Sequence, residues 1–400
     1  MKPNVLVVTT YYHPVVGGVE VHARQLVRYL HAHGFGVEVV TKQVEPTDKK
    51  RVLIDGVPVR RLAPPGARRG SGKWLMLPAL AARMVRARAR YDVVVCVDYR
   101  GIGAAAIPLA RLMRKRVVAQ GEVAGVLAGA DAQSTSGLPR ESAIARLLRG
   151  PVRAIYKQAD TIVCIGRDLE REAIRAGVPR ERVVYLPHGV DIARFRRPEP
   201  GERELLRARF GWPQERPIVL FVGRLSVEKG VNDLVEAWRI ADRGDALLVL
   251  VGPDMPGHAW DAGAPARAYV AAHGLGDAVR FEGSTPDPAP FYRAADVFVQ
   301  PSHFEALGNT AIEAMASGVP VVTSAVGGLG DFCVDGQTAV VHEPRSAASL
   351  ARAIERMLGD PALRARIAGA GYAVARERFE ANALLERYAA LVERLAAPAR

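Results

Sequence analysis

The stretch PSHFEALGNTAIEAMASGVPVVTSAVGG, residues 301–328, places two carboxylates at the start of an expected helix. It follows the apolar run DVFVQ, which predicts a buried strand. The next segment contains good helix formers, and Asn309 is the expected N-cap. Glu305 then lies in the loop before the helix, and Glu313 lies one turn inside it. A strand, a loop and a helix in this order are typical of an α/β sheet with a ligand at its edge.

The residue types around this helix start favour a ligand that carries both phosphates and hydroxyls. The free N–H groups and the dipole of a helix start attract an anion, whereas carboxylates accept hydrogen bonds from hydroxyls. Acidic residues also occur at helix starts without any function, because they stabilise that end. Upstream, however, PIVLFVGRLSVEKGVNDLVEAW predicts a strand over 218–222 that is followed by Arg224 and Lys229 in a loop. Cations beyond a strand's carboxyl end suit a diphosphate, so the two segments together indicate a nucleotide-sugar site.

Four segments spread over the chain carry a resemblance to a known family. They are VVTTYYHPVVGGVEVHARQLVRYLHAHGFGVEVVT near the start, LPHGVD at 186–191, VGRLSVEKG at 222–230 and the E-x7-E segment that joins Glu305 to Glu313. With them the chain resembles the retaining GT-B glycosyltransferases of the E-x7-E type (family 4-like, group 1). That group includes sucrose synthases, bacterial mannosyltransferases and bacterial-type glycogen synthases.

The expected fold class is α/β, and the resemblance implies GT-B: two Rossmann-like doubly wound domains that face each other across a cleft. Apolar runs that alternate with helical segments independently predict parallel sheets with helices on both faces. The expected strands are 4–9, 36–41, 57–62, 92–97, 116–120, 161–165 and 182–186, then 217–222, 246–251, 279–282, 296–300, 320–323 and 338–341. The expected domains are residues 1–190 on the acceptor side, a linker at 191–215, residues 216–380 on the donor side, and a helix at 381–400 that crosses back to the first domain.

The resemblance also implies roles for individual residues. Arg224 and Lys229 match the basic pair that holds the two phosphates, Glu313 matches the ribose-binding carboxylate, and Glu305 matches the one beside the donor sugar. Gly17 and Gly18 let the backbone approach a phosphate at the start of a helix. The expected catalytic residues are Glu305, Arg224, Lys229 and Glu122. The expected donor-binding residues are Gly17, Gly18, Gly223, Arg224, Lys229, Glu305, Ala306, Leu307, Gly308, Asn309 and Glu313.

The first half departs from the family pattern at Glu122. The family usually has a histidine after a strand at this place, whereas RVVAQGE, 116–122, ends in a glutamate. A carboxylate can still accept a hydrogen bond from a sugar hydroxyl, but the choice of sugar and full activity are left open. His188 replaces the usual asparagine of LPNGVD and is interpreted as structural.

The charge and the cysteine content limit which classes of partner and which cellular compartment fit this sequence. Residues 1–199 hold 34 Lys and Arg against 17 Asp and Glu, and residues 200–400 hold 21 against 25, so the net charge of +13 comes from the first half. This charge attracts anionic surfaces such as a membrane, although arginine-rich solvated helices would give the same count. Nothing matches a nucleic-acid motif. Cys96, Cys164 and Cys333 lack metal or disulfide spacing, and no apolar run is long enough to span a bilayer. The expected location is cytoplasmic, and a peripheral position on the inner face of the cytoplasmic membrane is left open.

The expected reaction is metal-independent transfer of a sugar, with retention, from a nucleoside-diphosphate sugar to a hydroxyl acceptor. Neither a cofactor nor a metal is expected, because positioned cations can neutralise the leaving diphosphate. The acceptor is expected to be a lipid-linked or polysaccharide envelope glycan. Alternatives are a non-catalytic nucleotide-sugar-binding partner in a biosynthetic complex and a UDP-sugar epimerase of the same fold. A short G-x-G-x-x-A match at 101–106 imitates a dinucleotide fingerprint. The sugar, the base, the linkage and the oligomeric state stay open.

Overall fold

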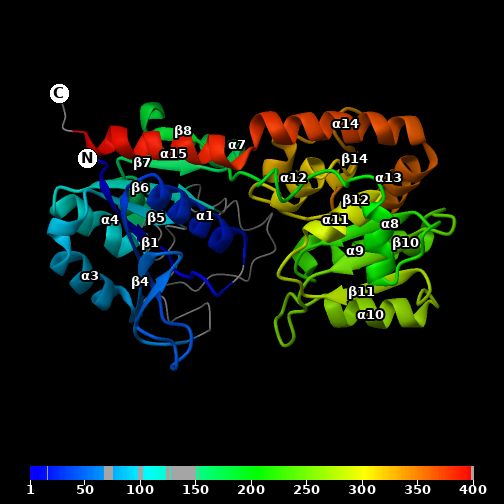
Figure 1. Ribbon diagram of the computed structural model, residues 1–400, viewed down its shortest axis with the longest axis horizontal. Helices are drawn as coiled ribbons and strands as arrows, with labels where there is room; N and C mark the ends of the chain where they lie inside the picture. The colour runs from blue at the N-terminus through cyan, green and yellow to red at the C-terminus, as the bar shows by residue number, and fades with distance from the viewer. Residues whose placement is uncertain are drawn as a thin grey trace. The chain divides into compact units, whose positions relative to one another are not determined.

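The chain folds into two compact units. The computed structural model describes residues 1–15, 17–66, 75–97, 102–122, 127, 150–151 and 153–397. One unit comprises Met1–Gly189 with Asn382–Arg400, and the other comprises Val190–Ala381 (Figure 1). Each unit has its own parallel sheet and its own hydrophobic core. The predicted α/β class with two doubly wound domains is confirmed.

The first unit is built on an eight-stranded sheet in the order β3-β4-β2-β1-β5-β6-β7-β8. The strands pair in parallel except for β3 and β4, which form an antiparallel hairpin at the edge. Each strand expected in this half is present, but β3 was not predicted. Its hairpin turns at Asp55 and Gly56, where φ is 51° and 78°, so the Asp-Gly pair was a usable signal. The strands are β1 (Asn4–Val8), β2 (Gly36–Lys42), β3 (Arg51–Ile54), β4 (Val57–Leu62), β5 (Val93–Val97), β6 (Arg116–Gly121), β7 (Thr161–Cys164) and β8 (Val183–Tyr185).

Helices cover this sheet, and the last of them comes from the end of the chain. Helix α15 buries Leu384, Tyr388 and Val392 in the same core as residues of β1 and β2, and it is drawn in red in Figure 1. The chain therefore returns to its first unit after completing the second. The helices of this unit are α1 (Gly18–Ala32), α3 (Leu77–Arg86), α4 (Gly103–Leu112), α7 (Arg167–Arg175) and α15 (Ala381–Ala396), with short 3-10 turns η1 (Arg88–Arg90) and η2 (Arg180–Arg182).

The second unit has a six-stranded, fully parallel sheet in the order β11-β10-β9-β12-β13-β14. Counted from its own first strand, this is the order 3-2-1-4-5-6 of a doubly wound fold, whose switch point lies between the first and fourth strands. Here that point lies between β9 and β12. The strands are β9 (Ile218–Val222), β10 (Leu247–Val251), β11 (Val279–Gly283), β12 (Val297–Gln300), β13 (Val321–Ser324) and β14 (Val340–His342).

The segment expected to be a linker, 191–215, contains a helix of the second unit. Helix α8 buries Leu206 and Arg207, and the Arg207 guanidinium donates to the carbonyl of Ala294 at 3.0 Å at the end of α11. Because backbone carbonyls accept from its guanidinium, Arg207 can be buried in the second unit. The high charge content of this segment had predicted a linker instead. The helices of this unit are α8 (Glu202–Phe210), α9 (Val231–Ile240), α10 (Gly263–Ala272), α11 (Ala289–Ala294), α12 (Asn309–Ala316), α13 (Ala347–Gly359) and α14 (Pro361–Arg378), with 3-10 turns η3 (Val227–Lys229) and η4 (Gly327–Asp331).

Candidate active site

The expected donor-side residues of the second unit lie at its topological switch point. The loop after β9 runs from Gly223 through η3 to Gly230, and the loop after β12 runs over 301–308. Because β9 and β12 are neighbours in a parallel sheet, their following loops meet at the same edge. In open α/β sheets, ligands bind in the crevice at this position.

The two loops are in close backbone contact, which only glycine permits. Gly230 has a φ of 71°, and a Cβ added there would lie 2.1 Å from the carbonyl oxygen of Pro301. The amide of His303 donates to the carbonyl of Glu228 at 2.8 Å, which holds the loops together a few residues further on. Gly230 therefore places the end of η3 directly against the loop that carries Glu305.

Lys229 and Glu305 form an ion pair across these loops. The ammonium of Lys229 donates to Oε1 of Glu305. The same oxygen accepts from Gln300 Nε2 at 2.6 Å and from Ser302 Oγ at 2.9 Å. Glu305 is buried, so these three donors compensate its charge and fix its orientation. The sequence predicted Lys229 and Glu305 as site residues, but it did not predict their contact or the part of Gln300 and Ser302.

Arg224 lies near the start of the same loop, two residues after β9, and has its own acidic partner. Its guanidinium donates to Oε1 of Glu228, four residues later, and its side chain is 39% exposed. Gly223, just before it, has a φ of 157° and donates its amide to the carbonyl of Val251 at 2.9 Å. Both cations of the loop are thus balanced by carboxylates.

Helix α12 begins one residue earlier than expected. Gly308, with a φ of 96°, occupies the N-cap position and Asn309 is the first helical residue, so the expectation of Asn309 as N-cap was wrong. A left-handed backbone at this position favours glycine over asparagine. The loop residues Ala306, Leu307 and Gly308 lead directly into the helix. The first N–H groups of a helix have no intrahelical acceptor, so this start can bind an anion or a hydroxyl.

Glu313 lies inside α12, and the pKa of its carboxyl group is raised. Its Oε2 accepts from the hydroxyl of Tyr292 at 2.9 Å. Burial of the carboxyl raises its pKa to about 7, while the Tyr292 hydrogen bond acts in the opposite direction. The residue is only partly buried by surface area, so a ligand can reach it. Tyr292 was not predicted, because only the packing of α11 on α12 brings it here.

The remaining expected residues belong to the first unit. Gly17 is extended, with a φ of −170°, and precedes α1, which starts at Gly18. Glu122 follows β6 and is buried, where it accepts a hydrogen bond from Gln120 and contacts His188 Nε2 at 3.2 Å. Gly101 of the G-x-G-x-x-A match lies outside the described residues.

Comparison with known proteins identifies the family. The model of glycosyltransferase family 4 matches residues 16–194, and the model of glycosyl transferases group 1 matches residues 202–374. A D-inositol 3-phosphate glycosyltransferase of Catenulispora acidiphila is 31% identical over 365 residues, which cover 86% of this chain and 83% of that protein. The chain belongs to the group 1 glycosyltransferases.

Solved structures agree with this assignment. Sucrose-phosphate synthase from Thermosynechococcus elongatus superposes on this glycosyltransferase with a TM-score of 0.83 and 27% identity, over 98% of this chain and 99% of the other. Anabaena HepE in complex with UDP superposes with a TM-score of 0.78 and 20% identity, over 98% and 99% of the two chains. These similarities confirm the GT-B fold.

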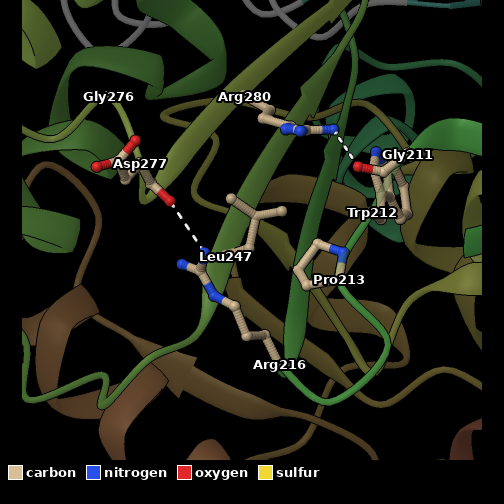
Figure 2. A pocket seen from close by; sticks show the side chains of 8 residues that line it. All are labelled: Gly211, Trp212, Pro213, Arg216, Leu247, Gly276, Asp277 and Arg280. Carbon is tan, nitrogen blue, oxygen red and sulfur yellow. Dashed lines mark hydrogen bonds between the residues drawn. The ribbon is translucent and has the colours of Figure 1, made fainter.

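A surface cavity of about 490 Å³ lies at the opposite edge of the second sheet, and Figure 2 shows it. Its two arginines face backbone carbonyl groups: Arg216 donates to Asp277 at 3.1 Å, and Arg280 donates to Gly211 at 2.7 Å (Figure 2). These guanidinium groups hold the neighbouring loops together by hydrogen bonds to their backbone. The arginines of the cavity therefore have a structural role that requires no ligand. It lies at the amino ends of β9, β10 and β11, away from the switch point. The lining residues are Gly211, Trp212, Pro213, Arg216, Leu247, Gly276, Asp277 and Arg280.

Among the described residues, no group of three or more His, Cys, Asp or Glu side chains is arranged to hold a metal ion. Across the same residues, every helix of this glycosyltransferase is too short or too polar to cross a lipid bilayer.

Proposed function

We propose that this glycosyltransferase transfers a sugar, with retention at the anomeric carbon, from a nucleoside-diphosphate sugar to a hydroxyl acceptor. The observation that carries the proposal is the contact between Lys229 and Glu305 at the switch point of the second sheet. It joins a cation suited to a phosphate to a carboxylate suited to a sugar hydroxyl. Arg224 on the same loop supplies a second cation, and guanidinium groups bind phosphate bidentately.

In this proposal, different residues bind the diphosphate, the ribose and the transferred sugar of the donor. Arg224 and Lys229 bind the diphosphate, together with the N–H groups from Ala306 to Asn309 at the start of α12. Glu313 accepts from the ribose hydroxyls, and Glu305 accepts from a hydroxyl of the transferred sugar. Gly17 and Gly18, at the start of α1 in the first unit, stay predictions as donor-binding residues.

The chemical step needs no separate base in this proposal. The bond between the anomeric carbon and the diphosphate oxygen breaks, and a bond from the acceptor oxygen to that carbon forms on the same face. The acceptor's proton passes to the departing diphosphate oxygen. The two cations stabilise the charge that develops on the leaving group, so a metal ion is not required.

The acceptor is proposed to be a lipid-linked or polysaccharide glycan of the cell envelope. The support is the charge of residues 1–199, which hold 34 basic against 17 acidic side chains and would attract an anionic membrane surface. The relatives include proteins named for other substrates and products, since one is named a D-inositol 3-phosphate glycosyltransferase and another a sucrose-phosphate synthase.

Transfer from sugar nucleotides is expected to proceed at the same rate, within about twofold, with and without excess EDTA, because Arg224 and Lys229 take the place of a metal. UDP-, GDP- and ADP-sugars are supplied with either a lipid-linked glycan or a soluble phosphorylated polyol, and the anomeric configuration of the product is read by NMR. Loss of rate in EDTA contradicts metal independence, and an inverted product contradicts retention. Binding without turnover favours the non-catalytic partner. Conversion of the donor sugar without any acceptor favours the epimerase.

Nucleoside diphosphates are expected to bind about tenfold more tightly at pH 8 than at pH 6. The pKa of Glu313 is about 7, so its carboxyl is mostly protonated at the lower pH and loses acceptor capacity for the ribose. The phosphates of the ligand also titrate in this range. Glu313→Gln is therefore the matched control, since its side chain cannot ionise and should retain only the ligand's own pH dependence. Identical pH profiles for the two proteins, measured by calorimetry, would remove Glu313 from the ribose site.

A further inference from the structure

A second surface cavity, of about 480 Å³, lies in the first unit, and we call it the amino-edge cavity. It is formed where β6, β7 and β8 begin, since Arg116 opens β6 and Arg182 directly precedes β8. The expected site residues of this unit, such as Gly18 and Glu122, instead follow the carboxyl ends of β1 and β6. The amino-edge cavity therefore lies at the edge of the sheet opposite to them. Its lining residues are Arg111, Arg116, Lys157, Gln158, Asp160 and Arg182.

The lining of this cavity carries a large excess of positive charge. Four basic side chains against one carboxylate give it a formal charge of +3. The cavity in Figure 2 has nearly the same volume, but its two arginines and one aspartate give a formal charge of only +1. Like charges that are gathered around a concave surface repel one another and attract an anion. The charge of its lining therefore distinguishes the amino-edge cavity from the cavity in Figure 2, whose arginines have a structural role.

Asp160 compensates only part of this charge. Its Oδ1 accepts from Arg111 at 2.8 Å and from Arg116 at 3.1 Å, and its Oδ2 accepts from the amide of Val117 at 2.8 Å. The Asp160 side chain is 9% exposed, whereas those of Arg111 and Arg116 are 48% and 43% exposed. Only one nitrogen of each guanidinium is engaged by this carboxylate, and a guanidinium has five N–H donors. The exposed donors of the two arginines can therefore reach a ligand in the cavity.

Lys157 and Arg182 supply the other two cations. The guanidinium of Arg182 donates to the backbone carbonyls of Lys157 and Ala159, which holds these residues at the cavity. The Nε of Arg182 is buried and has no hydrogen-bond partner among the described residues. The ammonium of Lys157 forms neither a hydrogen bond nor an ion pair within the part of the chain that the structure describes. Buried donors without an acceptor are rare, so these two cations favour a ligand with several acceptor oxygens.

We propose that the amino-edge cavity binds a phosphate group. A phosphate group carries three acceptor oxygens and close to two negative charges, and a guanidinium can bind it through two parallel hydrogen bonds. A carboxylate has two oxygens and one charge, so it would match fewer of the donors and less of the charge. Asp160 repels an anion, but two arginines engage it and the cations outnumber it. The phosphate group belongs either to a soluble compound or to a phospholipid headgroup, and its binding does not depend on the proposed transfer reaction.

Titration with inorganic phosphate, followed by calorimetry at constant ionic strength, tests this site. The background protein carries Lys229→Met and Glu305→Gln, which takes the candidate donor site out of the measurement. Lys157→Gln and Arg111→Gln each remove one cation from the amino-edge cavity. Lys157→Gln breaks no ion pair among the described residues, so it should unfold at the same temperature as the background protein. Arg280→Gln is the matched control, because it removes one exposed arginine from the cavity in Figure 2.

Inorganic phosphate is expected to bind saturably to the background protein. Lys157→Gln and Arg111→Gln should each weaken this binding about tenfold, as for the loss of one hydrogen bond from a charged group. Arg280→Gln should bind phosphate within about twofold of the background protein. Acetate at the same ionic strength should not displace the phosphate. Equal competition by acetate, or an equal loss of affinity in all three variants, would show a diffuse attraction of anions and would overturn the phosphate site.

Lipid vesicles distinguish the two sources of the phosphate group. The same proteins are sedimented with phosphatidylcholine vesicles that either contain or lack phosphatidic acid, whose headgroup is a phosphate. If a headgroup is the ligand, only vesicles with phosphatidic acid bind, and Lys157→Gln weakens this binding while Arg280→Gln does not. If a soluble compound is the ligand, inorganic phosphate binds and neither kind of vesicle does. A protein that binds neither inorganic phosphate nor phosphatidic acid would overturn the proposal, and it would leave the proposed transfer reaction unaffected.

Discussion

Lys229→Ala is expected to lower kcat/KM for sugar transfer by at least about 1000-fold. A single preorganised donor to a developing negative charge contributes on the order of 100- to 1000-fold, and Lys229 carries a full positive charge in a partly buried site. The loss should appear mainly in kcat, because the charge on the diphosphate grows as the glycosidic bond breaks. Steady-state kinetics with a saturating acceptor measure it. A fully active Lys229→Ala would contradict the phosphate assignment.

The control for this variant addresses the buried carboxylate that it leaves behind. Removing one partner of a largely buried ion pair leaves Glu305 uncompensated, which destabilises a protein by up to about 3–5 kcal/mol. Gln300 and Ser302 still donate to Glu305, so we expect the lower part of that range. In Lys229→Met combined with Glu305→Gln, the thermal stability should largely return while the activity stays lost. Recovery of activity together with stability would show that the pair serves only the fold.

Glu305→Ala is expected to cause a loss of similar size, on the order of 1000-fold in kcat/KM. The variant removes the proposed contact to the donor sugar and frees Lys229 from the position that Oε1 gives it. Three donors that converge on that oxygen lose their acceptor at once, so Glu305→Gln should be milder in stability yet still strongly impaired in transfer. Asp254→Asn is the control, because Asp254 forms an exposed ion pair with Arg267 in the same unit. Such surface pairs contribute about 0–1 kcal/mol, and this variant should keep full activity; a Glu305→Ala enzyme that resembled it would remove Glu305 from the site.

Much of the fold could be predicted from local pattern. Short apolar runs separated by helical segments determine where a parallel strand begins and ends, and every strand predicted in this way is present. The edge strand β3 was missed because its apolar run, 52–54, is short and does not alternate with polar residues as a half-buried strand usually does. Helix α8 was missed for a related reason, since Arg207 is buried through hydrogen bonds to distant carbonyls rather than through apolar character.

The site was predicted in composition but not in geometry. Lys229 and Glu305 could be chosen from the loops that follow two expected strands, because the switch point of a doubly wound sheet places such loops together. Their 76-residue separation hid the direct contact. The hydrogen bond from Tyr292 that orients Glu313 likewise exists only once α11 packs on α12. The sequence pattern indicates which functional groups lie at the edge of the sheet. Which buried polar groups form hydrogen bonds with one another depends on tertiary packing.

The first half shows the same limit at Glu122. Its departure from the family pattern was visible in the sequence, and so was the histidine at 188. Their contact across 66 residues was not, and neither was the stacking of His22 on His188. Two separate departures from a pattern become one buried carboxylate–imidazole pair only in the folded unit.

The most direct test of the nucleotide-sugar site is thermal unfolding of the wild type and of Lys229→Met combined with Glu305→Gln across UDP-, GDP- and ADP-sugars, with NAD as the negative control. A donor at 100 times its dissociation constant should add about 2.7 kcal/mol to the free energy of unfolding. We expect sugar nucleotides of one base to raise the melting temperature of the wild type, with little or no shift in the double variant. A wild type that no sugar nucleotide stabilises, or an equal shift in both proteins, would contradict the site.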